Sequence, residues 1–249
     1  MRTALLASLL LSACWSKPTS SSTPANTAAA TTAPAGPAPV VAFGTSEFAT
    51  PHLPAVSRDG ARVLLAIQDH DGGRGYPNLR LELRDRDDKV LATHVVLSVE
   101  EADGYLEDQV IQAKVKPRLE AANAWLVEQH RALGLSPLTA MTVERGPEAD
   151  GPQERLAQQR TARAADHSLT WDGGVVQIAS TSAKLLDRKT PGDWLAKSRD
   201  LGDGFVCHNA AYVEGAAIDP AHRVAVLEVG YTGTDTCWEP NFQHHVIAW

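Results

Sequence analysis

The side chains best suited to catalysis or ligand binding lie in the polar, glycine-rich stretch 69–78, whose sequence is Asp-His-Asp-Gly-Gly-Arg-Gly-Tyr-Pro-Asn. Its carboxylates could offer oxygen ligands to a calcium ion, or the stretch could form the lip of a binding site. It lacks the third oxygen ligand before the glycine and the distant glutamate that an EF-hand loop requires. We therefore expect a solvated connection between two strands, with no metal and no cofactor.

Nine histidines and 30 acidic residues could supply a catalytic or metal site, but such groupings need geometry to carry weight. The chain contains no Gly-x-Ser-x-Gly elbow, His-Glu-x-x-His pair, Ser-x-x-Lys nucleophile or phosphate-binding loop. A hydrolase would have to use scattered residues, for which Asp69, Asp71 and His208 are the candidates. His244 and His245 are neighbours on an expected strand and should face opposite sides of its sheet.

The N-terminus has the layout of an export signal, with a positive start at Arg2 and an apolar segment over residues 4–11. The sequence Leu11-Ser12-Ala13-Cys14 closes this segment with small residues and a cysteine. It resembles the lipobox of bacterial lipoproteins. The resemblance implies a signal peptide at residues 1–13, cleavage before Cys14, and a lipid on that cysteine that anchors the chain to a membrane. The alternative is an ordinary signal peptide with a chance cysteine.

Residues 14–39 consist almost wholly of Ser, Thr, Ala, Pro, Gly and Asn, which cannot form a core. We expect a disordered tether that holds a single folded β-rich domain, residues 40–249, away from the bilayer. By analogy with the retention rule of lipoproteins, Trp15 in place of aspartate implies an outer-membrane location in the cell envelope. No apolar run is long enough to predict a membrane-spanning helix.

The two remaining cysteines, Cys207 and Cys237, form an even pair in a compartment where disulfides persist. We predict that they are bonded to each other. A metal site with His208, His244 and His245 as further ligands is the alternative, although no tight Cys-x-x-Cys spacing supports it.

Length and charge exclude some classes of protein. A chain of 249 residues with 43% hydrophobic residues can bury a sizeable core. The formal net charge is -7, and the first 39 residues contain two basic and no acidic residues, so residues 40–249 carry -9. Such a surface would repel a phosphate backbone, and we predict no nucleic-acid partner.

Short apolar or alternating runs, separated by turn residues, indicate antiparallel strands in the folded part. In the run 79–84, leucine alternates with charged residues, which is typical of a sheet with one face in water. Four tryptophans, Trp171, Trp194, Trp238 and Trp249, are expected in the core or at its edges. The expected strands are residues 63–69, 79–84, 90–97, 168–171, 175–180, 184–187, 224–231 and 245–249, with turns at Asp87-Asp88 and Asp172-Gly173-Gly174.

One strong helix signal lies at about residues 98–133. Ser98 and Glu101 fit a capping box, and Gly134 supplies a C-terminal stop. Pro117 lacks an amide donor and should kink the helix or divide it in two, while Trp125 should pack on the sheet. The apolar stripe is expected at Leu106, Val110, Ala113, Leu119, Ala122, Leu126 and Leu133. The predicted fold class is therefore α+β, mostly antiparallel β-sheet with a long helical insertion.

Two segments, residues 54–65 and 216–227, are alike in having a small turn that feeds an apolar strand. The first resembles the Pro-x-x-Ser-Pro-Asp-Gly blade motif of TolB-like propellers, with Arg58 in place of the second proline. A propeller needs several such blades, so a generic turn-strand unit explains the pair better. The domain as a whole is similar to exported bacterial lipoproteins of unknown function.

These patterns favour a lipid-anchored envelope protein with a non-catalytic binding or structural domain. We expect it to contact an envelope protein or a cell-wall component through its sheet face or the 69–78 segment. The alternative is an envelope hydrolase with a scattered His/Asp site. A deep pocket with convergent polar groups and displaced pKa values would favour that alternative.

Overall fold

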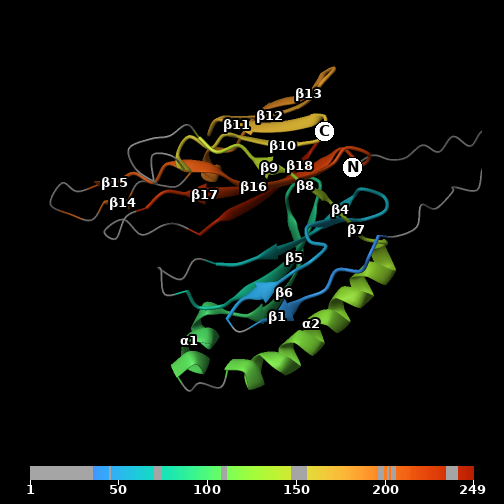
Figure 1. Ribbon diagram of the computed structural model, residues 1–249, viewed down its shortest axis with the longest axis vertical. Helices are drawn as coiled ribbons and strands as arrows, with labels where there is room; N and C mark the ends of the chain where they lie inside the picture. Colours follow the sequence, from blue (N-terminus) through green and yellow to red (C-terminus); the bar gives the residue numbers. More distant parts are fainter. Residues whose placement is uncertain are drawn as a thin grey trace, which may run out of the picture. The chain divides into compact units, whose positions relative to one another are not determined.

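The computed structural model describes residues 36–44, 46–69, 75–107, 111–146, 156–195, 199–200, 202, 206–233 and 241–249. All of them belong to one compact unit, Pro34–Trp249. This unit consists mostly of antiparallel sheets with one long helix, stacked in layers (Figure 1). Because the helical share is small, the fold is more β-rich than the α+β class that we expected.

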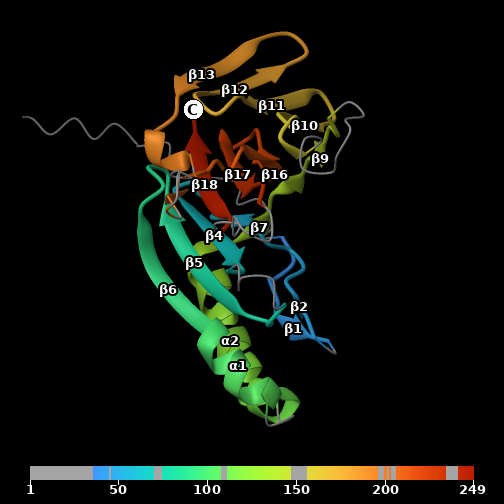
Figure 2. The same ribbon diagram turned by 90° about the vertical axis from the view of Figure 1, so that its left-hand side faces the viewer.

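The first sheet has the strand order β6-β5-β4-β3-β7, and every pair in it is antiparallel. Helix α2 (Ile111–Leu133) covers one of its faces, as Figures 1 and 2 show. The strands are β3 (Ala55–Val56), β4 (Arg62–Ile67), β5 (Leu79–Asp85), β6 (Val90–Leu97) and β7 (Ser136–Pro137).

The second sheet, of order β18-β17-β16-β8, lies between the first sheet and a third sheet of order β13-β12-β11-β10-β9. Its strands are β8 (Thr139–Ala140), β16 (Ala211–Asp219), β17 (Val224–Tyr231) and β18 (Gln243–Ala248). The third sheet comprises β9 (Thr142–Val143), β10 (Thr161–Ala164), β11 (His167–Trp171), β12 (Val175–Ser180) and β13 (Lys184–Lys189).

Strand β17 explains the stacking. Its side chains are buried on both faces: Ala225 and Leu227 pack toward the third sheet, while Val224 and Val226 pack toward the first. A strand that is apolar at successive positions can satisfy both faces only between two other layers. The second sheet is therefore the centre of the molecule, and two apolar interfaces hold it there.

The helical segment follows the predicted capping. Ser98 and Glu101 bond reciprocally: Glu101 N donates to Ser98 Oγ at 3.3 Å, and Ser98 N donates to Glu101 Oε2 at 3.2 Å. Helix α1 (Val99–Glu107) follows, and α2 ends before Gly134, which has a φ of 63° and donates its N–H to the His130 carbonyl.

The sequence predicted a kink or a division of the helix at Pro117. The division is wrong, because helix α2 runs through Pro117. The buried stripe of α2 begins with Ile111 and Val115, whereas Ala113, which we placed on that stripe, is exposed. The later stripe residues Ala122 and Leu126 are buried, as expected. Leu106 and Val110 fall outside the described side chains.

The alternation of leucine and charged residues in β5 predicted the environment of only one of its two faces correctly. Leu79, Leu81 and Leu83 are buried against α2, as expected. The opposite face was expected to lie in water, and this is wrong, because the second sheet covers it and Glu82 is only 6% exposed. The charges of this face pair with one another instead of with water.

Smaller elements complete the unit. Gly36 N donates to Ser136 Oγ, so this residue already contacts the first sheet. Trp171 and Trp194 are buried as expected, Trp249 packs against the same core, Trp125 stacks on His94 of β6, and Trp238 lies outside the described residues. The remaining elements are the pairs β1 (Ala42–Phe43) with β2 (Phe48–Ala49) and β14 (Arg199–Asp200) with β15 (Val206–Cys207), and the short 3-10 helix η1 (Gly192–Trp194).

Candidate functional site

A pocket of about 800 Å³ opens between the first and second sheets beside the β1–β2 hairpin. Its volume lies in the range of small-molecule sites. The first sheet contributes Leu65 and Leu79, and apolar residues of β16 and β17 form the facing wall. The polar and aromatic lining residues are Ser46, Glu47, Phe48, Thr50, Gln68, Asp69, Tyr76, Asn78, Glu214, Glu228, Phe242 and His244.

Asn78 organises one side of the pocket. Its Oδ1 accepts the Asp69 N–H at 2.6 Å, and its Nδ2 donates to the carbonyls of Asp69 at 2.8 Å and Tyr76 at 3.2 Å. Asn78 is only 5% exposed. The expectation of a solvated connection over 69–78 therefore fails for its described ends, because a buried amide ties them together and they line the pocket.

Glu228 is an acidic residue that lines the pocket from β17. It follows Val224 and Val226 on the face of β17 that meets the first sheet, a position that would otherwise be apolar. Burial raises the pKa of Glu228 to about 7, and the negative charge of Glu214 contributes to the increase. Glu228 is therefore only partly ionised at neutral pH.

The register of the second sheet places a glycine and a histidine on either side of Glu228. Gly215 pairs with Glu228 from β16, and His244 pairs with it from β18. A Cβ on Gly215 would lie 2.7 Å from Glu228 Oε2, so glycine leaves the space that the carboxyl group occupies. A β-bulge precedes Gly215 and leaves Glu214 as the extra, exposed residue of β16 at the pocket.

His244 lies against Glu228, with Nε2 at 3.4 Å from Oε1 and a side chain that is only 10% exposed. Burial, together with the positive charges of Arg84 and Arg80, lowers the pKa of His244 to about 4. The distance is that of an ion pair, but burial disfavours both charged forms. The two groups are therefore neutral between about pH 4 and pH 7, with the shared proton on Glu228.

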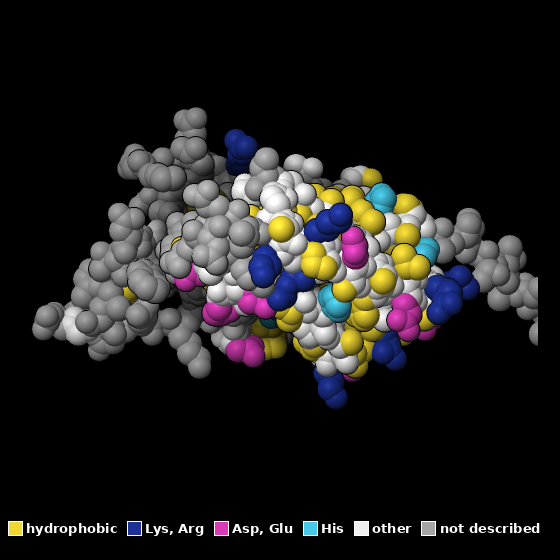
Figure 3. Space-filling model, turned by 90° about the horizontal axis from the view of Figure 1, so that it is seen from below, with side chains coloured by type: hydrophobic (Ala, Val, Ile, Leu, Met, Phe, Trp, Pro, Cys, Tyr) yellow, Lys and Arg dark blue, Asp and Glu magenta, His cyan; other side chains and the backbone are white. Residues whose placement is uncertain are grey.

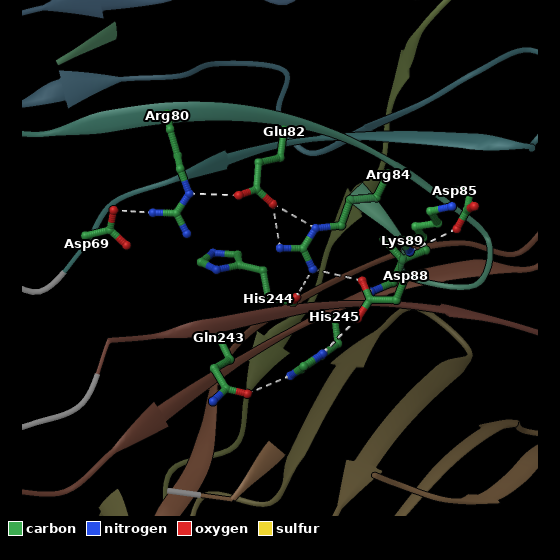
Figure 4. A network of polar contacts seen from close by, with 11 residues as sticks. Asp69, Arg80, Glu82, Arg84, Asp85, Asp88, Lys89, Gln243, His244 and His245 are labelled. Carbon is green, nitrogen blue, oxygen red and sulfur yellow. Dashed lines mark hydrogen bonds and ion pairs between the residues drawn. The ribbon is translucent and has the colours of Figure 1, made fainter. Parts of the chain in front are cut away.

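A chain of charged side chains on β5 lies next to the His244 ring, as Figure 4 shows. Glu82 accepts from Arg80 Nε at 2.8 Å and from Arg84 Nη2 at 2.6 Å. Arg80 also pairs with Asp69, and Arg84 pairs with Asp88 at 2.9 Å and donates to the His244 carbonyl. Burial alone would raise the pKa of Glu82, but the hydrogen bonds from both arginines outweigh it and hold the pKa below the ordinary value.

His245 points away from the pocket. Its Nδ1 lies 2.9 Å from Asp88 Oδ2, and its ring stacks on Trp194 with centroids 3.7 Å apart. His244 and His245 thus occupy opposite faces of β18, as the strand prediction required. Asp88 joins β5 to β18 because it also accepts the Val246 N–H at 2.8 Å.

Of the catalytic candidates from the sequence, the two that the structure describes, Asp69 and His208, are not brought together. Asp69 lines the pocket, whereas His208 is exposed and is not among the pocket residues. Cys207 is 1% exposed. Asp71, Cys14 and Cys237 lie outside the described residues, so the lipid site and the Cys207–Cys237 bond stay predictions. Within the described part of the chain, no group of three or more His, Cys, Asp or Glu side chains is placed to hold a metal ion.

Glu214, Glu228 and Gly215 were not predicted from the sequence as site residues, and His244 was not assigned to a pocket. One signal was available for Glu228, which is the single charged residue in the run 224–231, Val-Ala-Val-Leu-Glu-Val-Gly-Tyr. A charged side chain in a strand that is buried on both faces must be paired, neutralised or functional.

The chain matches no protein-family model, no curated protein and no solved structure. Among the described residues, no helix has the length and apolar character to cross a membrane.

Proposed function

We propose that this chain is an exported, lipid-anchored envelope protein that binds a small organic ligand in the pocket between its first two sheets. The observation that carries the binding role is the pocket of about 800 Å³, which combines apolar walls with a few buried polar groups. The anchor part of the proposal rests on the lipobox resemblance at Cys14.

The pocket supports a binding role better than the outer surface drawn in Figure 3. On that face, among the described residues, charged side chains of both signs are interspersed with hydrophobic ones. Single exposed apolar residues such as Val95 and Val127 are ordinary on a protein surface. The concave, partly apolar pocket offers a far more selective surface than this mixture.

A matched pair of variants tests the binding role. Ala140 lines the pocket from β8, whereas its neighbour Thr139 does not, and both are exposed. We expect Ala140→Trp to fill the pocket and Thr139→Trp to leave it open. In a thermal-shift screen of small amines, sugars, amino acids and carboxylic acids against the detergent-extracted protein, the wild type and Thr139→Trp should be stabilised by the same compounds. Equal responses of the wild type and Ala140→Trp to every compound would refute the proposal.

A hydrolase is the second candidate, and the Glu228–His244 pair favours it. A carboxyl group that is protonated near neutral pH, beside a neutral imidazole, can act as a general acid or base in a pocket. If the protein is a hydrolase, Glu228→Gln should abolish turnover of chromogenic ester or glycoside substrates without abolishing binding. Turnover that Glu228→Gln leaves unchanged would rule out this role for the pair.

A further inference from the structure

We propose that the ligand of this pocket is a protonated organic amine, held by the carboxyl groups of Glu228 and Glu214. This inference rests on the proposed binding function and names the chemical class of the ligand. It stands on the charge of the pocket lining, on one buried polar group without a partner, and on the apolar walls.

The lining has an excess of acidic groups. Four acidic residues, Glu47, Asp69, Glu214 and Glu228, line the pocket, and the described lining contains no lysine or arginine. Asp69 is neutralised by Arg80. In the described part of the structure, neither Glu214 nor Glu228 pairs with a lysine or arginine, so a cation from outside would supply the missing charge.

His244 provides an independent sign of a ligand. Its side chain is nine-tenths buried and lines the pocket, yet its Nδ1 has no hydrogen-bond partner in the structure. Buried polar atoms are normally paired. Burial, with the charges of Arg84 and Arg80, keeps the imidazole neutral, so His244 does not repel a cation. When Glu228 is ionised, its carboxylate accepts from the His244 Nε2–H, and Nδ1 is then the ring nitrogen that can accept an N–H.

The pocket walls favour an organic cation over a metal ion. Phe48, Tyr76 and Phe242 line the pocket together with aliphatic side chains. Such surfaces bind the apolar body of a ligand, and the face of an aromatic ring attracts an ammonium group. A metal ion would instead need several oxygen ligands converging on one point, and the described residues contain no such group.

Amine binding should displace a proton. The titratable neighbours of Glu228 in its own sheet are Glu214 on β16 and His244 on β18. Asp69, which pairs with the Arg80–Glu82–Arg84 chain of β5, and Glu47 of the hairpin also line the pocket. An ammonium group beside Glu228 stabilises its ionised form, so the complex forms more readily once that carboxyl is deprotonated. Affinity for an amine should therefore rise between pH 6 and pH 8.

The test uses sets of compounds that share a skeleton and differ in charge, such as phenethylamine, 2-phenylethanol and 3-phenylpropionate. Ligand-observed NMR on the full-length, detergent-extracted protein ranks a library of such sets, and calorimetry then gives the affinities. We expect the amines to bind about tenfold more tightly than the matched alcohols and acids. The amines should also release protons, seen as different heats in buffers of different ionisation enthalpy.

Glu228→Gln is close in shape to the protonated residue and should fold, which circular dichroism can check. It should weaken amine binding about tenfold at pH 8 and abolish both the pH dependence and the proton release. Asp187→Asn, a matched loss of one carboxylate on β13 of the third sheet, should change neither. Glu214→Gln should weaken binding about threefold, because Glu214 is exposed.

Two kinds of failure are distinguishable. If neutral or anionic members bind as tightly as the amines, or if Glu228→Gln keeps the wild-type affinity and pH dependence, the amine assignment is overturned while a binding pocket stands. If no compound of any charge binds more weakly to Ala140→Trp than to the wild type, the pocket function itself fails, and the amine assignment with it.

Discussion

Replacing Glu82 by glutamine removes the central charge of the buried chain on β5. Glu82 is 6% exposed and bonds to both Arg80 and Arg84. Breaking a buried ion pair costs about 3 to 5 kcal/mol. Each arginine keeps one carboxylate, Asp69 or Asp88, so we expect the lower end of this range, about 3 kcal/mol. Urea unfolding followed by the fluorescence of buried tryptophans measures it.

The control is Glu144→Gln, which breaks the ion pair of Glu144 with Arg163, whose side chains are 49% and 59% exposed. That change should cost about 0.5 kcal/mol or less. If Glu82→Gln lowers the unfolding free energy by less than about 1 kcal/mol, the β5 ion pairs behave like exposed surface pairs, and the reasoning is refuted.

Acid provides a second check on Glu82. Its pKa is lowered in the folded protein, because the hydrogen bonds from the two arginines outweigh its burial. A carboxyl group with a lowered folded pKa stabilises the protein above its unfolded pKa, about 4.3, and loses this contribution as the pH falls. The difference in unfolding free energy between the wild type and Glu82→Gln should therefore be largest at neutral pH and shrink on acidification. A difference that grows in acid would contradict this assignment.

Four further outcomes follow from the structure and the sequence. Because burial raises the pKa of Glu228 to about 7, Glu228 costs stability as the pH rises from its unfolded pKa through that value. In urea unfolding, Glu228→Gln should therefore be more stable than the wild type at pH 8, by up to about 3 kcal/mol, and nearly equal to it at pH 4. Gly215→Ala puts a Cβ 2.7 Å from the flexible Glu228 carboxyl, so unfolding free energy should change by less than about 1 kcal/mol while amine affinity in calorimetry falls. Thiol counting on the denatured protein should find no free thiol from Cys207 and Cys237, and reduction should lower the unfolding free energy by about 3.5 kcal/mol in the chain-entropy model; two free thiols would contradict the bond. A fatty-acid analogue with a clickable tag should label the wild type in cells but not Cys14→Ser, and equal labelling would exclude the lipid site.

Local patterns predicted many of the elements. Strand β6 was expected over 90–97 and has those bounds, and the capping box at Ser98 and the stop at Gly134 both form. These features depend on residues close together in the chain, where capping and turn chemistry act locally. Strand β16 escaped prediction because Glu214 and Gly215 interrupt its apolar pattern, and the bulge that accommodates them depends on pairing with β17.

Most residues of the candidate site could not be predicted from local sequence patterns. Asp69 was proposed from its polar, glycine-rich surroundings, and it does line the pocket. The pairing of Glu228 with His244 depends on the register of β17 against β18, which no spacing within either strand reveals. The lowered pKa of His244 depends in addition on the charges of Arg84 and Arg80 on β5, which belongs to another sheet.

The sequence by itself determined which residues share a face in the predicted strands, and where the helical segment begins, at Ser98, and ends, at Gly134. These properties follow from backbone periodicity and short-range hydrogen bonds. It did not determine which faces meet. The sequence pattern of Arg80, Glu82 and Arg84 is the same whether the face is exposed to solvent or covered by a second sheet, since alternating charges suit both water and a paired network. These charges form a buried chain only because β18 packs over β5. That packing joins residues far apart in the sequence, and it creates the pocket with its neutral histidine and its carboxyl group of raised pKa.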